Sequence, residues 1–150
     1  MLRVSVPHAA LLLIAAGLAS AADKAYPIFT PEQFENNMQL LWRNFDAVNG
    51  SLAKNDYKTA KAELARSREL LAITITFWRD RKKDDAIKVL RETLAKIDDL
   101  DTALSAAKID PSAATAIAAQ VTAGCQSCHS RYREQDSDTK RYRFKRGLVQ

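Results

Sequence analysis

The two cysteines and the second histidine of this chain fall within one short segment, Cys125-Gln126-Ser127-Cys128-His129. On a helix, residues three and four positions apart share a face, so both thiols and the imidazole can meet one side of a flat macrocycle. Cysteines with this spacing add to the two vinyl groups of a haem, and the adjacent histidine becomes an axial ligand of the iron. The segment therefore predicts one covalent haem c, bound through Cys125 and Cys128, with His129 on the iron.

Three other interpretations explain the segment less well. A redox-active cysteine pair normally opens a helix after a strand, and no strand-like alternating stretch precedes Cys125. A structural zinc site needs four ligands, and the chain after residue 21 offers only two cysteines and one histidine. A disulfide between the two cysteines would leave the histidine unexplained. Haem attachment accounts for all three residues.

The first 21 residues have the parts of a secretory signal peptide. Arg3 supplies a positive charge, an apolar run extends from about residue 9 to residue 18, and Ala19-Ser20-Ala21 has the small-x-small form of a cleavage site. The alternative is an uncleaved membrane anchor, although the apolar run is short for a membrane span. We therefore expect export to the periplasm, with no stable insertion into the membrane.

Charge is distributed unevenly along the chain. Residues 22–130 carry 15 basic and 15 acidic side chains, whereas residues 131–146 carry seven basic and three acidic ones. A neutral body argues against binding to nucleic acid. A basic tail over residues 136–150 would attract an acidic redox partner. The alternative is a solvated tail, or one whose Tyr142 and Phe144 pack on the rest of the protein.

Start and stop signals divide the region between the signal peptide and the tail into four helices. Thr30 and Gln33 form a capping box around Pro31, and Gly50 is the expected end of this first helix. The second helix is capped by Asn55 or Asp56 and extends to about residue 78, although residues 73–78 have strand-like composition. The third spans about residues 85–107, and Asp110-Pro111 starts the fourth, which carries the cysteines.

Each of these segments carries an apolar stripe at helical spacing; in the first helix the stripe is Phe34, Met38, Leu41, Phe45 and Val48. Four such helices with short connections predict an all-α domain over residues 22–135, folded as an antiparallel four-helix bundle. A bundle of this kind holds a cofactor between facing helices, although the stripes alone would produce the fold without one.

A four-helix bundle with a haem motif near its C-terminus resembles the class II cytochromes c, the cytochrome c′ family; class I cytochromes c carry the motif near the N-terminus. As is common in class II, Cys125–His129 is followed by two residues and then by an aromatic and a basic residue, Tyr132 and Arg133. The resemblance covers roughly residues 30–135. The short connection at residues 79–84 and the tail beyond residue 134 depart from it.

The resemblance implies one of two activities. In one branch of the family, a methionine from the first helix is the sixth ligand of the iron, and the protein carries electrons. Met38 is the only methionine after the signal peptide, and it lies two turns into the first helix. In the other branch the iron is five-coordinate and binds nitric oxide or carbon monoxide. We expect the first activity, with Met38 and His129 on the iron and Arg133 near the haem; otherwise Met38 is one more core residue.

No paired carboxylates, nucleophile–base pair or phosphate-binding loop appear in the sequence, so no enzymatic activity is expected. The expected partners are redox proteins, acidic ones among them. The family often forms homodimers through its first two helices, and the sequence does not decide the oligomeric state. A third class of function, a haem-free helical interaction module, would make the cysteine pair incidental.

Overall fold

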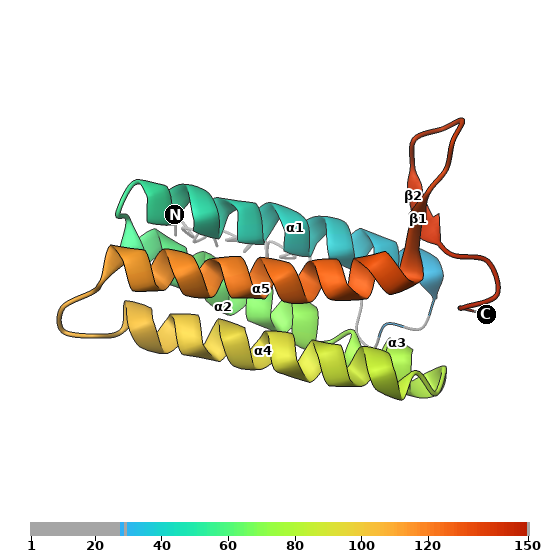
Figure 1. The fold of residues 1–150 in the computed structure, drawn as a ribbon, viewed down its shortest axis with the longest axis horizontal. Coiled ribbons are helices and arrows are strands. Elements are labelled where there is room, and N and C mark those ends of the chain that lie inside the picture. Colours follow the sequence, from blue (N-terminus) through green and yellow to red (C-terminus); the bar gives the residue numbers. More distant parts are fainter. Residues whose placement is uncertain (1–27, 29, 150) are drawn as a thin grey trace, which may run out of the picture.

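A computed structural model describes residue 28 and residues 30–149, and four long helices dominate this part of the chain (Figure 1). They are α1 (Pro31–Ala53), α2 (Tyr57–Ala72), α4 (Asp84–Leu104) and α5 (Pro111–Tyr132), with a short helix α3 (Ile75–Asp80) between α2 and α4. Two short strands, β1 (Arg133–Gln135) and β2 (Tyr142–Phe144), follow α5. The predicted all-α fold is confirmed, and the hairpin is an addition that the sequence did not predict. The expected signal peptide, residues 1–21, lies outside the described residues.

The long helices run antiparallel to their neighbours in the chain and lie side by side (Figure 1). α1 packs on α2, α2 on α4, and α4 on α5, and contacts between α1 and α5 close the ring. The buried Asn37 amide of α1 donates a hydrogen bond of 2.7 Å to the carbonyl of Leu70 in α2. Arg68 of α2 and Asp98 of α4 form an ion pair of 2.5 Å across the next pair of helices.

The predicted helix starts are confirmed by their caps. The capping box of Thr30 and Gln33 is present, and Asp56, rather than Asn55, accepts the capping hydrogen bond of α2. The Asp110 carboxylate caps α5. The end predicted at Gly50 is wrong: α1 continues to Ala53 and so brings Leu52 into the core, where it is buried.

The prediction that the second helix runs unbroken to residue 78 is also wrong. The helix stops at Ala72, and α3 begins at Ile75 after a short turn. Side chains bond the backbone carbonyls at this interruption: Thr74 donates to Leu71 at 2.7 Å, and Asn37 donates to Leu70. Such bonds offset the cost of interrupting a helix inside the protein.

The core consists of two clusters of apolar side chains. The larger one joins all four long helices and includes Val48, Leu64, Ile97 and Val121. The second, which we call the aromatic cluster, lies where α1 begins and α5 ends; it contains Ile28, Phe34, Phe77, Trp78, Ala86 and Tyr132, and Phe144 of β2 packs against it. The short helix α3 supplies this cluster with two of its rings, Phe77 and Trp78.

α4 and α5 approach each other closely at Gly124, directly before the first cysteine. A side chain built on Gly124 would overlap the hydroxyl of Thr93, which is only 3% exposed. The buried Thr93 hydroxyl is held by a hydrogen bond of 2.8 Å to the carbonyl of Val89. The absence of a side chain at residue 124 therefore sets the spacing of the two helices beside the cysteines.

We expect Gly124→Ala to lower the free energy of unfolding by about 1–3 kcal/mol, the usual cost of overpacking a closed core. Urea denaturation measures this change. Adding Thr93→Ala should recover much of the loss, because it removes the atoms that the new methyl group meets. Gly50→Ala is the matched control: nothing lies within 4 Å of a side chain there, so a gain of about 0.5–1 kcal/mol is expected. Similar losses at both glycines would contradict the close approach.

Candidate cofactor-binding site

The predicted haem ligands Cys125, Cys128 and His129 all lie in the last two turns of α5. The alanine-rich sequence of α5 favours a helix. Its last residue, Tyr132, is buried, and the Tyr132 hydroxyl donates a hydrogen bond of 2.7 Å to Asp85 at the start of α4. The end of the helix that carries the motif is therefore fixed to the neighbouring helix.

Both cysteines are free thiols and are half-buried. Cys125 packs against the larger core cluster and Cys128 against the aromatic cluster. Burial raises the pKa of both thiols, for Cys128 to about 11, so that both are uncharged at neutral pH. A nucleophilic cysteine needs a lowered pKa, so this environment disfavours that role. The same environment suits sulfur atoms that form uncharged covalent bonds.

His129 is also half-buried, and burial, together with the nearby charge of Arg133, lowers its pKa to about 4. The imidazole is therefore neutral at pH 7 and keeps a nitrogen lone pair, which a metal ion requires. Its Nδ1 atom is buried without a hydrogen-bond partner in the described part of the chain. Buried polar atoms are nearly always paired, so this atom is unusual in a folded protein.

Met38 lies on α1, half-buried, where it packs against both core clusters. Cys125 packs against the larger cluster and Cys128 against the aromatic cluster, so Met38 shares one cluster with each thiol. Met38 and His129 share no contact given by the structure, and the ligation of iron by Met38 stays a prediction.

α1 leaves apolar surface uncovered beside Met38. Trp42, one turn further along, is 69% exposed, and Phe45 is half-buried. Residues three and four positions apart are neighbours on a helix, so Met38, Trp42 and Phe45 form one strip. Exposed apolar strips are typical of surfaces that bind an apolar group or another protein.

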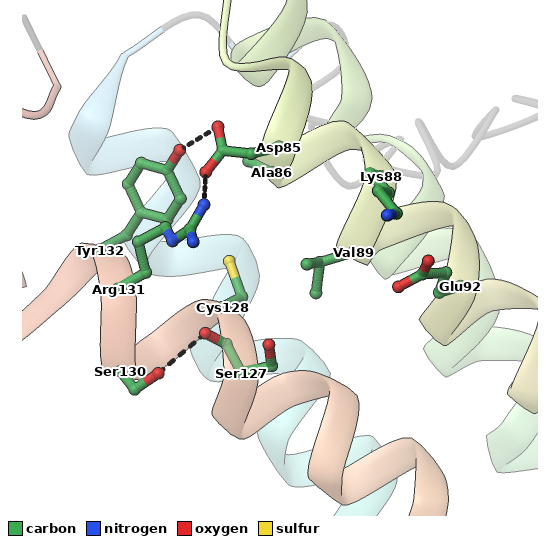
Figure 2. A pocket seen from close by; sticks show the side chains of 10 residues that line it. All are labelled: Asp85, Ala86, Lys88, Val89, Glu92, Ser127, Cys128, Ser130, Arg131 and Tyr132. Atoms are coloured by element: carbon green, nitrogen blue, oxygen red, sulfur yellow. Dashed lines mark hydrogen bonds and ion pairs between the residues drawn. The ribbon is translucent and has the colours of Figure 1, made fainter.

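A pocket of about 410 Å³ opens between α4 and α5 (Figure 2). Its size falls within the usual range for small-molecule sites. The Cys128 sulfur points into the gap between the helices, and charged side chains of Lys88, Glu92 and Arg131 line the surrounding walls. Neither Cys125 nor His129 lines this pocket, so it meets only one of the three residues of the motif.

Asp85 is a residue of this site that the sequence analysis did not single out. Its carboxylate accepts a hydrogen bond from Tyr132 and is paired with Arg131 (Figure 2). These two interactions lower the pKa of Asp85, whereas burial and the Asp85 charge raise the pKa of Tyr132. In the sequence, Asp85 is recognisable only as a residue at the start of a helix. Its partners Arg131 and Tyr132 lie 46 and 47 positions further along the chain, so no local pattern links them to Asp85.

Arg133 stands directly after α5. Its backbone N–H bonds the carbonyl of His129, and its guanidinium carbon lies 3.9 Å from the ring centre of Tyr142. Arg133 thus places a positive charge near the imidazole of His129, and its guanidinium group stacks on the Tyr142 ring across the hairpin.

Comparisons with known proteins add no relative: no family model, no curated protein and no solved structure matches this chain. Among residue 28 and residues 30–149, no group of three or more histidine, cysteine, aspartate or glutamate side chains is placed to hold a metal ion. None of the helices described here is long and apolar enough to cross a membrane. The resemblance to class II cytochromes c therefore depends on the motif and its position in the chain.

The protonation of His129 can be tested by NMR titration of the haem-free chain. We expect its ring to titrate near pH 4 instead of 6.5, and Arg133→Gln to raise this pKa by removing a nearby positive charge. Arg91→Gln, an exposed change on α4, should leave it unaltered. Titration of the folded wild type near 6.5 would contradict the burial of the imidazole.

The same shift makes stability depend on pH. Between pH 6.5 and about 4 the unfolded chain binds the proton better than the folded chain does. The free energy of unfolding should therefore decrease as the pH falls through this window. His129→Gln should remove that part of the dependence, as measured by urea denaturation at a series of pH values.

Proposed function

We propose that this protein is an exported monohaem c-type cytochrome of class II that carries single electrons. The observation that carries the proposal is the segment Cys125–His129 at the fixed end of α5, where both thiols are uncharged and half-buried. The neutral imidazole of His129, with a buried Nδ1 that has no partner in the described residues, supports it further.

Cys125 and Cys128 would hold the haem through thioether bonds. Each S–H would add across one vinyl group, so no oxidant would be needed and the products would be uncharged. Such bonds suit the apolar surroundings of Cys125 and Cys128. His129 contributes its lone pair without first losing a proton, because its lowered pKa keeps it neutral. Haem, when bound, supplies an iron centre that gains and loses one electron.

Met38 is the proposed second protein ligand of the iron. Its half-buried thioether reaches both core clusters from α1, the helix that closes the bundle on α5. A thioether ligand raises the reduction potential, which suits an electron carrier. The apolar strip formed by Met38, Trp42 and Phe45 would exclude water on this side of the site.

The role of carrier fits the rest of the chain. Residues 1–21 have the form of an export signal, and periplasmic location agrees with a redox protein that exchanges electrons with other proteins. We propose no enzymatic reaction, since three of the polar residues around Cys128, Asp85, Arg131 and Tyr132, bond one another and hold α5 to α4. No binding to nucleic acid is proposed for a body that carries almost no net charge.

Covalent attachment predicts that haem stays with the polypeptide in denaturing electrophoresis and acid–acetone extraction. Cys125→Ala/Cys128→Ala should lose the haem completely under these conditions, because no thioether can form. Ser127→Ala, a change between the two cysteines, should retain it and serves as the control. Release of haem from the wild type would show that the proposed attachment is wrong.

Ligation by Met38 predicts a low-spin ferric protein with the weak far-red absorption band of a thioether–iron bond. Met38→Leu keeps the apolar volume and removes the sulfur, so the band should vanish and carbon monoxide should bind readily. Phe45→Leu, a change in the same strip, should keep the band. A high-spin wild type that binds carbon monoxide without mutation would favour the alternative, a five-coordinate protein that binds nitric oxide or carbon monoxide.

A further inference from the structure

The basic residues that follow α5 belong to a folded hairpin. β1 and β2 pair antiparallel, with Arg133 opposite Phe144. The Phe144 ring lies 5.3 Å from that of Phe34 and 5.5 Å from that of Phe77, so the hairpin is anchored in the aromatic cluster. The backbone N–H of Lys145 donates a further hydrogen bond of 2.9 Å to the backbone carbonyl of Tyr132. The hairpin therefore holds its charges in a fixed place beside the end of α5 (Figure 1).

Two of these basic side chains are used within the hairpin and its junction with α5. Arg143 bonds Glu134 at 3.0 Å and Asp136 at 2.8 Å. The ammonium group of Lys145 donates a hydrogen bond of 2.7 Å to the carbonyl of Ser130, the residue directly after His129. These two cations support the local structure and are poorly available to a partner.

Three other cations face solvent. Lys140 and Arg146 are exposed and form no ion pair within the described part of the chain. The Lys140 ammonium donates a hydrogen bond of 2.7 Å to the carbonyl of Ser137, but, unlike the half-buried Lys145, Lys140 is exposed, and no carboxylate neutralises its charge. Arg141 is 78% exposed, and its pair with Glu35 is loose, at 3.8 Å. An exposed pair at this distance contributes little and is easily exchanged for another carboxylate. Lys140 and Arg141 lie in the connection between β1 and β2, and Arg146 lies just after β2. These three residues, which we call the basic face, are thus positively charged and accessible.

We infer that the basic face is a docking surface for an acidic patch on a partner protein. The charge is local: the hairpin is strongly basic, whereas residues 22–130 carry equal numbers of basic and acidic side chains. Lys145, which follows β2, is bonded to the residue after His129, so a partner held by the hairpin would lie at the end of the bundle that carries the motif (Figure 1). Its role in electron exchange rests on the proposed function, but the docking itself does not require haem.

A protein is favoured over an anionic lipid surface. The hairpin also carries Glu134, Asp136 and Asp138, and Asp136 organises the turn by accepting hydrogen bonds from Asp138 and Thr139. Anionic membranes attract uninterrupted clusters of lysine and arginine, and carboxylates at the same surface would be repelled. A protein surface with charges of both signs can match such a mixed pattern and fix one orientation.

The test uses the haem-loaded protein and cytochrome b5, an acidic haem protein, as the probe. The variant Lys140→Asn/Arg141→Gln/Arg146→Gln removes the basic face and leaves Arg143 and Lys145 intact. Asparagine suits residue 140, which has a positive φ of 58°. The control Lys54→Gln/Lys58→Gln/Lys108→Gln removes the same charge from exposed residues at the opposite end of the bundle (Figure 1).

At low salt we expect the variant to exchange electrons with the probe about tenfold more slowly than the wild type. The control should stay within about twofold of the wild type. Raising the salt concentration should abolish most of the difference, because exposed charges are screened over about 10 Å at 0.1 M. Equal rates for variant and control would overturn the docking surface, provided that both keep the wild-type haem spectrum.

A second measurement separates docking from the proposed function. Adding the probe should shift the backbone amide NMR signals of residues 139–147 in the wild type and not in the variant, whether or not haem is bound. Shifts in a chain that never binds haem would support the docking surface and refute the cytochrome. Binding to phosphatidylglycerol vesicles that depends on the basic face, without shifts from the probe, would overturn a protein partner.

Discussion

The hydrogen bond from Tyr132 to Asp85 is the constraint on which the site depends. It joins the last residue of α5 to the first turn of α4, with Tyr132 buried against Trp78, at a ring separation of 4.7 Å, and Arg131 paired to the same carboxylate. The chain carries the cysteines just before Tyr132 and continues into the hairpin just after it. The three residues of the motif and the hairpin therefore adjoin the same junction between α4 and α5.

The helices were predictable because their signals are local. Caps such as Thr30, Asp56 and Asp110 act within one turn, and an apolar stripe repeats every three or four residues. The interruption after Ala72 was not predictable, since it depends on Asn37 reaching the Leu70 carbonyl from another helix. The sequence allowed Phe144 to pack on the rest of the protein, and it does, but the hairpin itself escaped prediction because the rings that hold Phe144 lie far away in the sequence.

In the candidate site, too, some features were predictable from the sequence and others were not. The spacing of Cys125, Cys128 and His129 is visible in the sequence, and so is the position of Met38 in the first helix. The low pKa of His129 and the burial of its Nδ1 depend on packing, which no motif records. The division of the basic residues into those that hold the hairpin and those that face solvent likewise follows from ion pairs such as that of Arg143 with Asp136.

The aromatic cluster also ties the beginning of the described chain to its end. Phe34 opens α1, whereas Phe144 arrives only after every helix has been synthesised, and closing so long a loop is slow and entropically costly. A chain cut short before Phe144 would leave the rings of Phe34, Phe77 and Trp78 partly uncovered. Exposed aromatic surface promotes aggregation and proteolysis. The packing of β2 on the aromatic cluster thereby protects the whole fold from both of these fates.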